Sequence, residues 1–220
     1  MKRYIFEKLI THGLQLPVRL LVVFENLFKS FSYLSQANQD KIVLELLNGK
    51  EGGWFVELGG SNGVTSSNTY VLEKKYGWNG ICIEANKRFY KHLIKNRNCK
   101  TVRAVVSDNK EEVFFNNDGA TGHIDTKGEK MVSAPLAQIL KENDAPKVID
   151  YLSLDVEGHE EKVLHDFPFD KFRFRVMSIE RPSNRLHKKL IEVGYDLHSV
   201  LKPGGNWLDN IYVDSQLINS

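Results

Sequence analysis

The sequence predicts an α/β fold, in which helices cover both faces of a mainly parallel sheet whose last strand is antiparallel. Short apolar runs alternate with segments of helical periodicity along most of the chain, an alternation typical of parallel sheets. The last two apolar runs flank a Pro-Gly-Gly turn, which predicts a closing hairpin. With 220 residues, the chain is long enough for one such domain and short for two.

The first 34 residues are expected to form a helical appendage to an α/β domain over residues 35–220. Apolar side chains recur there at helical spacing, from Leu20 and Phe24 to Leu34, and give a wide apolar stripe. Pro17 and Arg19 interrupt the apolar run, so neither a membrane span nor a secretory signal is expected. Such an apolar helix face most often packs against the protein's own core. A peripheral membrane contact and a homodimer are the alternatives.

Within the domain, apolar runs and helical periodicities alternate as far as the closing hairpin. The apolar runs predict strands over residues 54–58, 80–84, 101–106, 148–154, 174–179, 195–201 and 210–213. Segments of 3.6-residue periodicity predict helices over residues 35–47, 66–76, 87–96, 135–142, 159–165 and 185–193.

Capping and turn residues support several of these boundaries. Ser35 can cap the first helix, Pro135 suits the first turn of the fourth, and Gly194 ends the last. Residues 112–115 can pair beside the third strand as a hairpin, and the polar stretch 116–130 is expected to be a loop.

The net charge gives no support to a nucleic-acid-binding protein, and the cysteine content argues against a disulfide-stabilised one. The formal net charge is only +2, so no strong positive field favours nucleic acid, and no nucleic-acid partner is expected. Cys82 and Cys99 are the only cysteines, too few for a disulfide scaffold, and they lack metal-ligand spacing. A cytoplasmic protein, in which Cys82 is a small buried apolar residue, fits best.

A glycine-rich loop follows the first strand over residues 57–63, with the sequence Glu-Leu-Gly-Gly-Ser-Asn-Gly. Ligands of open α/β sheets collect at this edge, where glycines let the backbone approach a ligand and Ser61, Asn62 and helix N–H groups can bind it. A dinucleotide loop would have the spacing Gly-x-Gly-x-x-Gly. The preceding acid and the different spacing favour a ligand with an amino-acid moiety over one with a pyrophosphate.

Two further strand ends carry polar residues suited to a nucleoside. Glu84 follows the second strand, where a carboxylate could accept hydrogen bonds from both hydroxyls of a ribose. Ser107 and Asp108 follow the third strand, where an adenine amino group could be bound. Asp108 taken alone is equally well explained as an ordinary turn residue.

One pattern could suggest a nicotinamide-dependent oxidoreductase. Tyr70 and Lys74 match the Tyr-x-x-x-Lys pair of short-chain dehydrogenases. They lie on the helix directly after the glycine loop, whereas that pair belongs much later in such chains. The position disfavours this alternative.

The sequence resembles the FkbM family of methyltransferases over roughly residues 35–214. The resemblance rests on Phe-Val-Glu-Leu-Gly at 55–59, Ser-Asn-Thr at 67–69, Ile-Glu-Ala-Asn at 83–86 and, most specifically, Asp-Val-Glu-Gly-His-Glu at 155–160. It implies a Rossmann-like class I methyltransferase with a seven-strand sheet. It also implies transfer of a methyl group from S-adenosylmethionine (SAM) to an oxygen of a small molecule or glycan. Gly60, Ser61 and His159 depart from the residues frequent in the family.

The glycine loop, the strand ends and the resemblance together give the expected cofactor site. The expected cofactor-binding residues are Glu57, Gly59, Gly60, Ser61, Asn62, Gly63, Asn68, Glu84, Ala85, Ser107, Asp108 and Asp155.

Four residues are expected on the acceptor side, because a neutral hydroxyl needs a base or a metal to lose its proton. These catalytic candidates are Asp155, Glu157, His159 and Glu180. Asp155, Glu157 and Glu180 could hold Mg²⁺ or Mn²⁺, or Asp155 and His159 could act as base and orienting partner. Glu160 is expected only to favour the N-terminus of its helix. A non-catalytic binding protein of the same fold is the remaining alternative.

Overall fold

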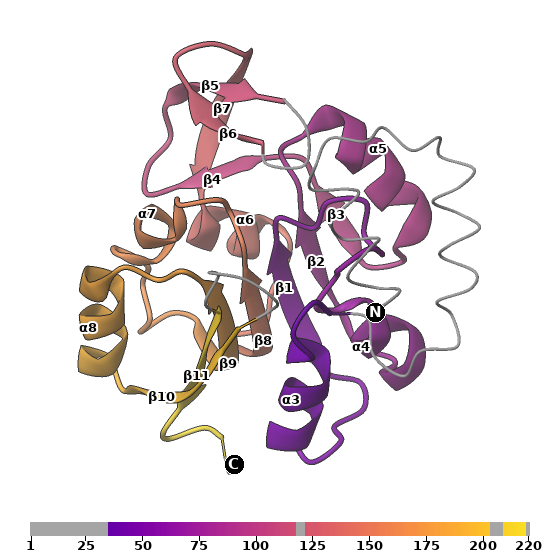
Figure 1. Ribbon diagram of the computed structural model, residues 1–220, viewed down its shortest axis with the longest axis vertical. Coiled ribbons are helices and arrows are strands. Elements are labelled where there is room, and N and C mark those ends of the chain that lie inside the picture. Colours follow the sequence, from indigo (N-terminus) through magenta and orange to yellow (C-terminus); the bar gives the residue numbers. More distant parts are fainter. Residues whose placement is uncertain (1–34, 118–121, 203–208, 219–220) are drawn as a thin grey trace.

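The computed structural model describes residues 35–117, 122–202 and 209–218, and its main element is a seven-stranded sheet (Figure 1). Its strand order is β10-β11-β9-β8-β1-β2-β3. The strands are β1 (Trp54–Leu58), β2 (Asn79–Ile83), β3 (Lys100–Val102), β8 (Val148–Leu154), β9 (Arg173–Glu180), β10 (Tyr195–Leu201) and β11 (Asp209–Asp214).

Pairing in this sheet is parallel except at the last strand. β1 pairs in parallel with β2 and β8, and β11 lies antiparallel between β9 and β10. The predicted mainly parallel seven-strand sheet with an antiparallel last strand is therefore confirmed.

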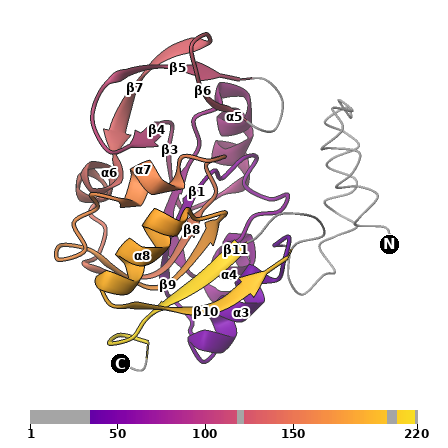
Figure 2. The same cartoon turned by 60° about the vertical axis from the view of Figure 1, so that its left-hand side comes forward.

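Helices cover both faces of the main sheet, as predicted (Figures 1 and 2). One face carries α6 (Leu136–Glu142), α7 (Glu160–Leu164) and α8 (Asn184–Glu192), and the other carries α3 (Gln39–Leu46), α4 (Tyr70–Tyr76) and α5 (Lys87–Asn96). Each layer buries its own hydrophobic cluster against the sheet. Cys82 is fully buried in one of them, as expected of a small apolar residue, and burial raises the pKa of its thiol.

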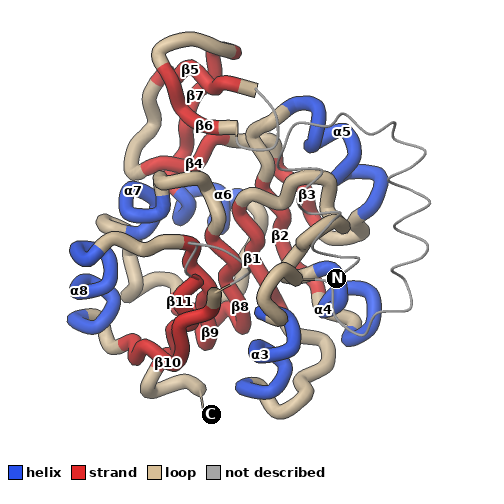
Figure 3. The backbone as a smooth tube through the Cα atoms, in the orientation of Figure 1, coloured by secondary structure: helices blue, strands red, loops and turns tan. Residues whose placement is uncertain are grey.

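A second, four-stranded sheet was not predicted (Figure 3). It has the order β4-β7-β5-β6 and consists of β4 (Val105–Ser107), β5 (Glu112–Asn116), β6 (His123–Asp125) and β7 (Glu129–Pro135). The strand expected over 101–106 is thus two strands in two sheets, and β6 and the start of β7 lie in the stretch expected to be a loop. β6 has a single apolar residue, Ile124, between two exposed polar ones, and β7 begins with two charged residues, so apolar periodicity could not reveal these strands.

Five of the six predicted helix starts differ from the observed ones, and those of α7 and α8 differ by a single residue. The second helix starts at Tyr70 instead of residue 66, because Ser66 has a positive φ of 59° that no helix tolerates. The first starts at Gln39 with Asn38 as its cap, while the Ser35 hydroxyl hydrogen-bonds to Asp40. Pro135 ends β7 and precedes α6, one position before its predicted place.

The predicted N-terminal appendage, residues 1–34, lies outside the described residues. Over the part of the chain that is described, no helix is both long and apolar enough to cross a membrane.

Candidate functional site

The predicted site residues gather at the carboxyl ends of β1, β2 and β8. The chain runs outward from β1 through β2 to β3, and outward from β8 to β9, so β1 and β8 flank the topological switch point. The amides of Gly59 and Gly60 both donate to the Ile83 carbonyl, and the amide of Asp155 donates to the Leu58 carbonyl. These bonds hold the three strand ends together.

The backbone conformation and close packing of the protein require glycine at two positions of the glycine-rich loop 57–63, called the cofactor loop below. Gly59 has φ +79°, and a Cβ there would lie 1.9 Å from the Asp155 carbonyl oxygen. Gly63 has φ +81°, and a Cβ there would lie 2.8 Å from Arg97 Cγ. Gly60 differs, since a Cβ would meet its nearest neighbours at an ordinary 3.5 Å. The Gly60 position therefore has room for the side chain of an alanine.

Asn62 closes the loop with its side chain. Its Oδ1 accepts from the amides of Val64 and Thr65, each at 2.9 Å, and its Nδ2 donates to Thr65 Oγ1. Asn62 thus shapes the segment that leads away from the glycines.

Glu84 lies at the carboxyl end of β2, at the predicted ribose position. Its two oxygens accept from the amides of Ser61 and Asn86 at 2.7 Å each, which ties the cofactor loop to the segment that starts α5. Burial raises the pKa of Glu84, and these amide hydrogen bonds oppose that shift. Each carboxylate oxygen can accept a second hydrogen bond, so ribose hydroxyls could still bind. Ala85 follows and packs against the small sheet's apolar cluster.

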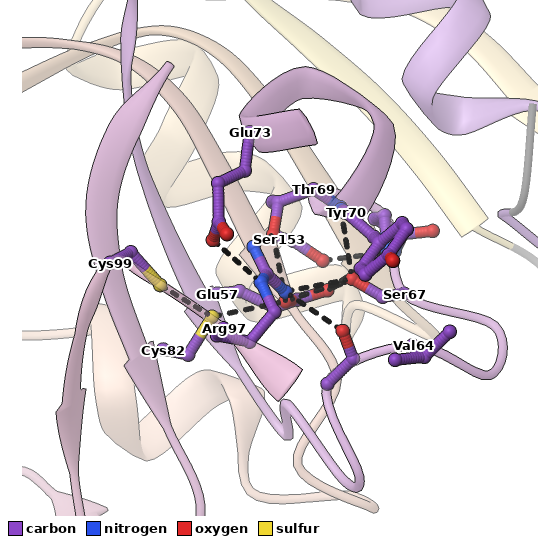
Figure 4. Close-up of polar contacts among 12 residues, drawn as sticks. Glu57, Val64, Ser67, Thr69, Tyr70, Glu73, Cys82, Arg97, Cys99 and Ser153 are labelled. Atoms are coloured by element: carbon purple, nitrogen blue, oxygen red, sulfur yellow. Dashed lines mark hydrogen bonds and ion pairs between the residues drawn. The ribbon is translucent and has the colours of Figure 1, made fainter. Parts of the chain in front are cut away.

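Glu57, expected to contact the cofactor, has its carboxylate surrounded by protein groups (Figure 4). It accepts hydrogen bonds from the Ser67 hydroxyl, the Asn68 amide and the Thr69 hydroxyl. It also accepts from the Cys82 thiol at 3.4 Å, and its charged partner is Arg97, whose Nη1 lies 2.9 Å from Glu57 Oε2. This carboxylate connects β1 to the segment 67–69 and to Arg97.

Ser107 and Asp108, expected on the adenine side, lie beside His159. The Ser107 hydroxyl donates to Asp108 Oδ1 at 3.0 Å and lies 3.4 Å from His159 Nε2. Burial and the nearby Lys162 charge lower the pKa of His159, which favours the neutral imidazole. The structure therefore brings His159 to the predicted adenine side.

Asp155, Glu157 and Glu180 form an acidic group with Arg181 on the acceptor side. Arg181 Nη2 lies 3.0 Å from Glu157 Oε2 and 2.8 Å from Glu180 Oε2. Burial, then the charges of Glu180 and Glu157, raise the pKa of Asp155 well above its usual range, and Asp155 is hydrogen-bonded to Glu180. Asp155 consequently holds a proton more tightly than an exposed aspartate does.

The predicted metal set of Asp155, Glu157 and Glu180 is not supported. Among the described residues, no three His, Cys, Asp or Glu side chains are arranged to hold a metal ion. Arg181 pairs with both Glu157 and Glu180, and so offsets part of their negative charge without a metal cation.

A polar pocket adjoins Asp155 at this edge of the sheet. Its lining also includes Ser66 and Asn68 beyond β1, Glu180 from β9, Asp209 from β11 and Gln39 from α3. The Gln39 amide donates a hydrogen bond to the Asp209 carboxylate, 170 residues along the chain. Asn68 Nδ2 donates to Ser153, but the buried Asn68 Oδ1 has no hydrogen-bond partner within the described residues. That oxygen can accept from an amino group of a ligand.

Four residues of the site escaped prediction from the sequence: Gln39, Glu73, Arg97 and Asp209. Their partners are distant in the sequence, and a single charged or amide residue beside a helix has no spacing that marks it.

The contacts of Glu160 agree with the role predicted for it at the N-terminus of its helix. Glu160 Oε1 accepts from the amides of Val156 and Gly158, at 3.1 Å each, just before the helix that Glu160 begins. Glu160 closes this turn and stabilises the helix N-terminus.

Several solved structures of similar fold are described as methyltransferases. The chain is 14% identical to the METTL16 methyltransferase domain, with a TM-score of 0.55 over 80% of this chain and 66% of that one. It is also 14% identical to human methyltransferase 10 domain containing protein, with a TM-score of 0.54 over 81% of each chain. The N-terminal domain of human METTL16 in complex with SAH is 15% identical, with a TM-score of 0.52 over 81% of this chain and 69% of that one.

Identities this low establish the fold alone, and the chain spans about two thirds of the METTL16 domain's length. No curated protein matches the chain by sequence. The family profile described as the methyltransferase FkbM domain, however, matches residues 57–197, from the acid of the cofactor loop to the middle of β10. The chain therefore belongs to the FkbM methyltransferase family.

Proposed function

We propose that this protein transfers a methyl group from SAM to a hydroxyl of a sugar, a glycan or another small hydroxylated metabolite, with Asp155 as the general base. Family membership and the fold support a SAM-dependent methyltransferase. The observation that carries the rest is the position of Asp155. It lies at the switch point against Gly59 of the cofactor loop and has a raised pKa, which makes its carboxylate a stronger base.

The residues at the switch point fit SAM chemically. Glu84 can accept from the ribose hydroxyls, and the unpartnered Asn68 Oδ1 can accept from the ammonium group of the methionine moiety. The acids beside the pocket, Asp155 and Glu180, favour the positively charged sulfonium and ammonium groups. The METTL16 N-terminal domain, of similar fold, is described in complex with SAH, the product that SAM leaves after methyl transfer.

When bound, SAM supplies a methyl carbon, to which the acceptor oxygen bonds as the carbon–sulfur bond breaks. Asp155 takes the proton that the hydroxyl loses. Glu180 lies beside Asp155 and favours its protonation, and Arg181 Nη2 lies 2.8 Å from Glu180 Oε2. The acids of the pocket and Gln39 offer hydrogen-bond partners to an acceptor rich in hydroxyl groups.

Asp155 is favoured over His159 as the base. His159 Nε2 faces the Ser107 hydroxyl at 3.4 Å, and Ser107 belongs to the predicted adenine side. Its lowered pKa makes His159 a weaker base than an ordinary histidine. We assign His159 to the cofactor side of the proposed site.

Calorimetric titration with SAM tests the cofactor assignment. Glu84→Ala should weaken SAM binding at least tenfold, because charge-assisted hydrogen bonds contribute about 1.5–3 kcal/mol each. Glu45→Gln, an exposed change on α3 whose only described partner is Lys41, is the control and should bind as the wild type does. A wild type that binds NADH and not SAM would contradict the proposal.

Methyl transfer is tested separately with a panel of sugars and hydroxylated metabolites. Incorporation of labelled methyl into one of them, with or without EDTA, is the expected result. A wild type that binds SAM tightly and methylates no hydroxyl in a broad panel would favour a non-catalytic binding protein of this fold.

A further inference from the structure

Arg97 lies directly beneath the cofactor loop, at the end of α5. Its side chain is 0% exposed, and the stem of the side chain packs against Gly63. A buried guanidinium is rare and requires partners for its charge and its donors. The partners of Arg97 therefore indicate the role of this buried side chain.

Every nitrogen of the guanidinium has a partner, and most partners belong to the cofactor loop or its anchor (Figure 4). Nη1 donates to Glu57 at 2.9 Å, to the Gly63 carbonyl at 3.3 Å and to the Ser67 hydroxyl at 3.1 Å. Nη2 donates to Thr69 Oγ1 at 2.8 Å. Nε donates to Glu73 of α4 at 2.7 Å, and that bond joins Arg97 to the helix that follows the loop.

The segment 59–69, which is the cofactor loop with its continuation to Thr69, needs such an anchor because its backbone is strained. Four of its residues have positive φ angles, namely Gly59, Ser61, Gly63 and Ser66. Two of these are serines, for which the left-handed region is unfavourable. Arg97 hydrogen-bonds to this segment at Gly63 and at Ser67, on both sides of the strained Ser66.

The negative charges of two neighbouring carboxylates give a second reason for a buried arginine at position 97. Glu57 and Glu73 are both buried, and Arg97 is the cation that lies between them. Burial alone would raise the pKa of Glu73, but the Arg97 charge and hydrogen bonds from Lys74 and the Asn98 amide lower it to about 2. Without Arg97, the hydrogen bonds of Glu57 to residues 67–69 would depend on a carboxylate with no counter-charge.

We propose that Arg97 is a positioning residue for the cofactor: through Glu57 and the Gly63 carbonyl, it holds the loop 59–69 in the shape that binds SAM. The inference rests on the proposed function. It also assigns Glu57, the acid of the loop motif, to Arg97 and to residues 67–69 in place of direct contact with the cofactor.

The test compares Arg97→Lys with Arg173→Lys. Both keep the charge and replace a forked donor by a single ammonium. Arg173 is the matched control, because it also binds a buried carboxylate, Asp214, and a backbone carbonyl, at the opposite end of the parallel strands. Arg97→Lys should raise the Kd for SAM at least tenfold and leave kcat at saturating SAM within threefold. Arg173→Lys should leave the Kd within threefold.

Hydrogen exchange without cofactor gives a readout that does not depend on SAM. Amides of residues 60–69 should exchange at least tenfold faster in Arg97→Lys than in the wild type, and at wild-type rates in Arg173→Lys. If the wild type fails to bind SAM, the proposed function fails, while the exchange data still show whether Arg97 holds the loop.

Equal changes in Kd for the two variants at equal loss of thermal stability would overturn the inference and make Arg97 a purely structural residue. Unchanged exchange over residues 60–69 would do the same. Should Arg97→Lys not fold, Thr69→Val keeps the side-chain shape and removes the hydroxyl that accepts from Arg97 and donates to Glu57. It should raise the Kd for SAM at least threefold, and an unchanged Kd would again overturn the inference.

Discussion

Asp155 carries a carboxyl group whose charged form the fold disfavours. Burial and the neighbouring acids raise its pKa, so the folded protein binds this proton more tightly than the unfolded chain does. A raised folded pKa contributes stability below the unfolded pKa of about 3.9, and that contribution is lost as pH rises through the folded pKa. The charged form of Asp155 therefore costs stability that the protein retains for reactivity.

Replacing Asp155 by asparagine should separate these two effects. Asp155→Asn should lower turnover by about 10²–10⁴, as expected for loss of a general base, and leave SAM affinity nearly intact. Because the disfavoured charge is removed, the variant should melt at a higher temperature than the wild type at pH 7 and lose that advantage at low pH. Turnover, SAM titration and melting curves from pH 4 to pH 8 measure this, and wild-type turnover in the variant would make Asp155 a structural residue.

Proton transfer to Asp155 also predicts the pH profile of the wild type. Turnover should fall as pH decreases through the raised pKa, so the acid limb should lie at higher pH than an ordinary aspartate near 3.9 would give. An acid limb at the ordinary aspartate value would contradict this assignment.

The glycines of the cofactor loop should differ in their tolerance of a methyl group. Gly60→Ala should cost less than about 1 kcal/mol and keep SAM affinity, since the nearest atoms to its Cβ lie at 3.5 Å. Gly63→Ala should be strongly destabilising, because the Cβ would approach Arg97 Cγ to 2.8 Å at a positive φ. Urea denaturation of both variants measures the difference, and equal losses would show that the loop shifts freely.

At the scale of the elements, the sequence predicts best where one apolar pattern matches one strand. The runs that became β1, β2, β8 and β9 are largely buried on both faces, so each shows as a mainly apolar run. The run at 101–106 gave no sign that the chain changes sheets between β3 and β4. Which sheet a strand joins depends on partners far away in the chain.

The same reason limits prediction of the site. Positions at strand ends, such as Glu84 and Asp155, could be inferred because parallel strands bring their carboxyl ends to one edge. The partners of those residues could not. The contact between Gln39 and Asp209 joins a helix start to the last strand of the sheet, and nothing in either local pattern requires the other.

The hairpin of β10 and β11 is anchored to β9 by one buried ion pair. Asp214 is fully buried and binds Arg173 together with the amides of Gln216 and Leu217. Asp214→Asn should lower the free energy of unfolding by about 3 kcal/mol, since it leaves a partly buried cation without its partner. SAM affinity should not change, because the pair lies at the start of β9. Denaturation and calorimetry test both, and a tenfold weaker SAM affinity would mean that the hairpin supports the cofactor site.

At the scale of the whole molecule, the described residues contain a complete sheet with both helix layers from Ser35 onward. Ser35 is buried, bridges to Ser66 and hydrogen-bonds to Asp40, so a shortened chain must keep it. A chain that starts at Tyr33 should therefore bind SAM within threefold of the full-length affinity.

Solution behaviour of the two chains tests the predicted division at residue 34. If the shortened chain is insoluble while the full chain is a monomer that ignores lipid vesicles, the first 34 residues belong to the core and the division is wrong. Vesicle binding or dimerisation of the full chain alone would identify what the predicted apolar stripe contacts.

The position of β11 has a consequence for the order in which the protein matures during synthesis. β11 leaves the ribosome after β10, yet it inserts between β10 and β9, and it carries the Asp209 that Gln39 binds. The half of the sheet that contains β1, β2 and β3 can assemble while the C-terminal segment is still being made. The nascent chain can thus form its cofactor loop early, but the wall of the polar pocket at Asp209 closes only when β11 is in place. Under the proposed function, the nascent chain thus gains its SAM site before the pocket proposed for the acceptor is complete.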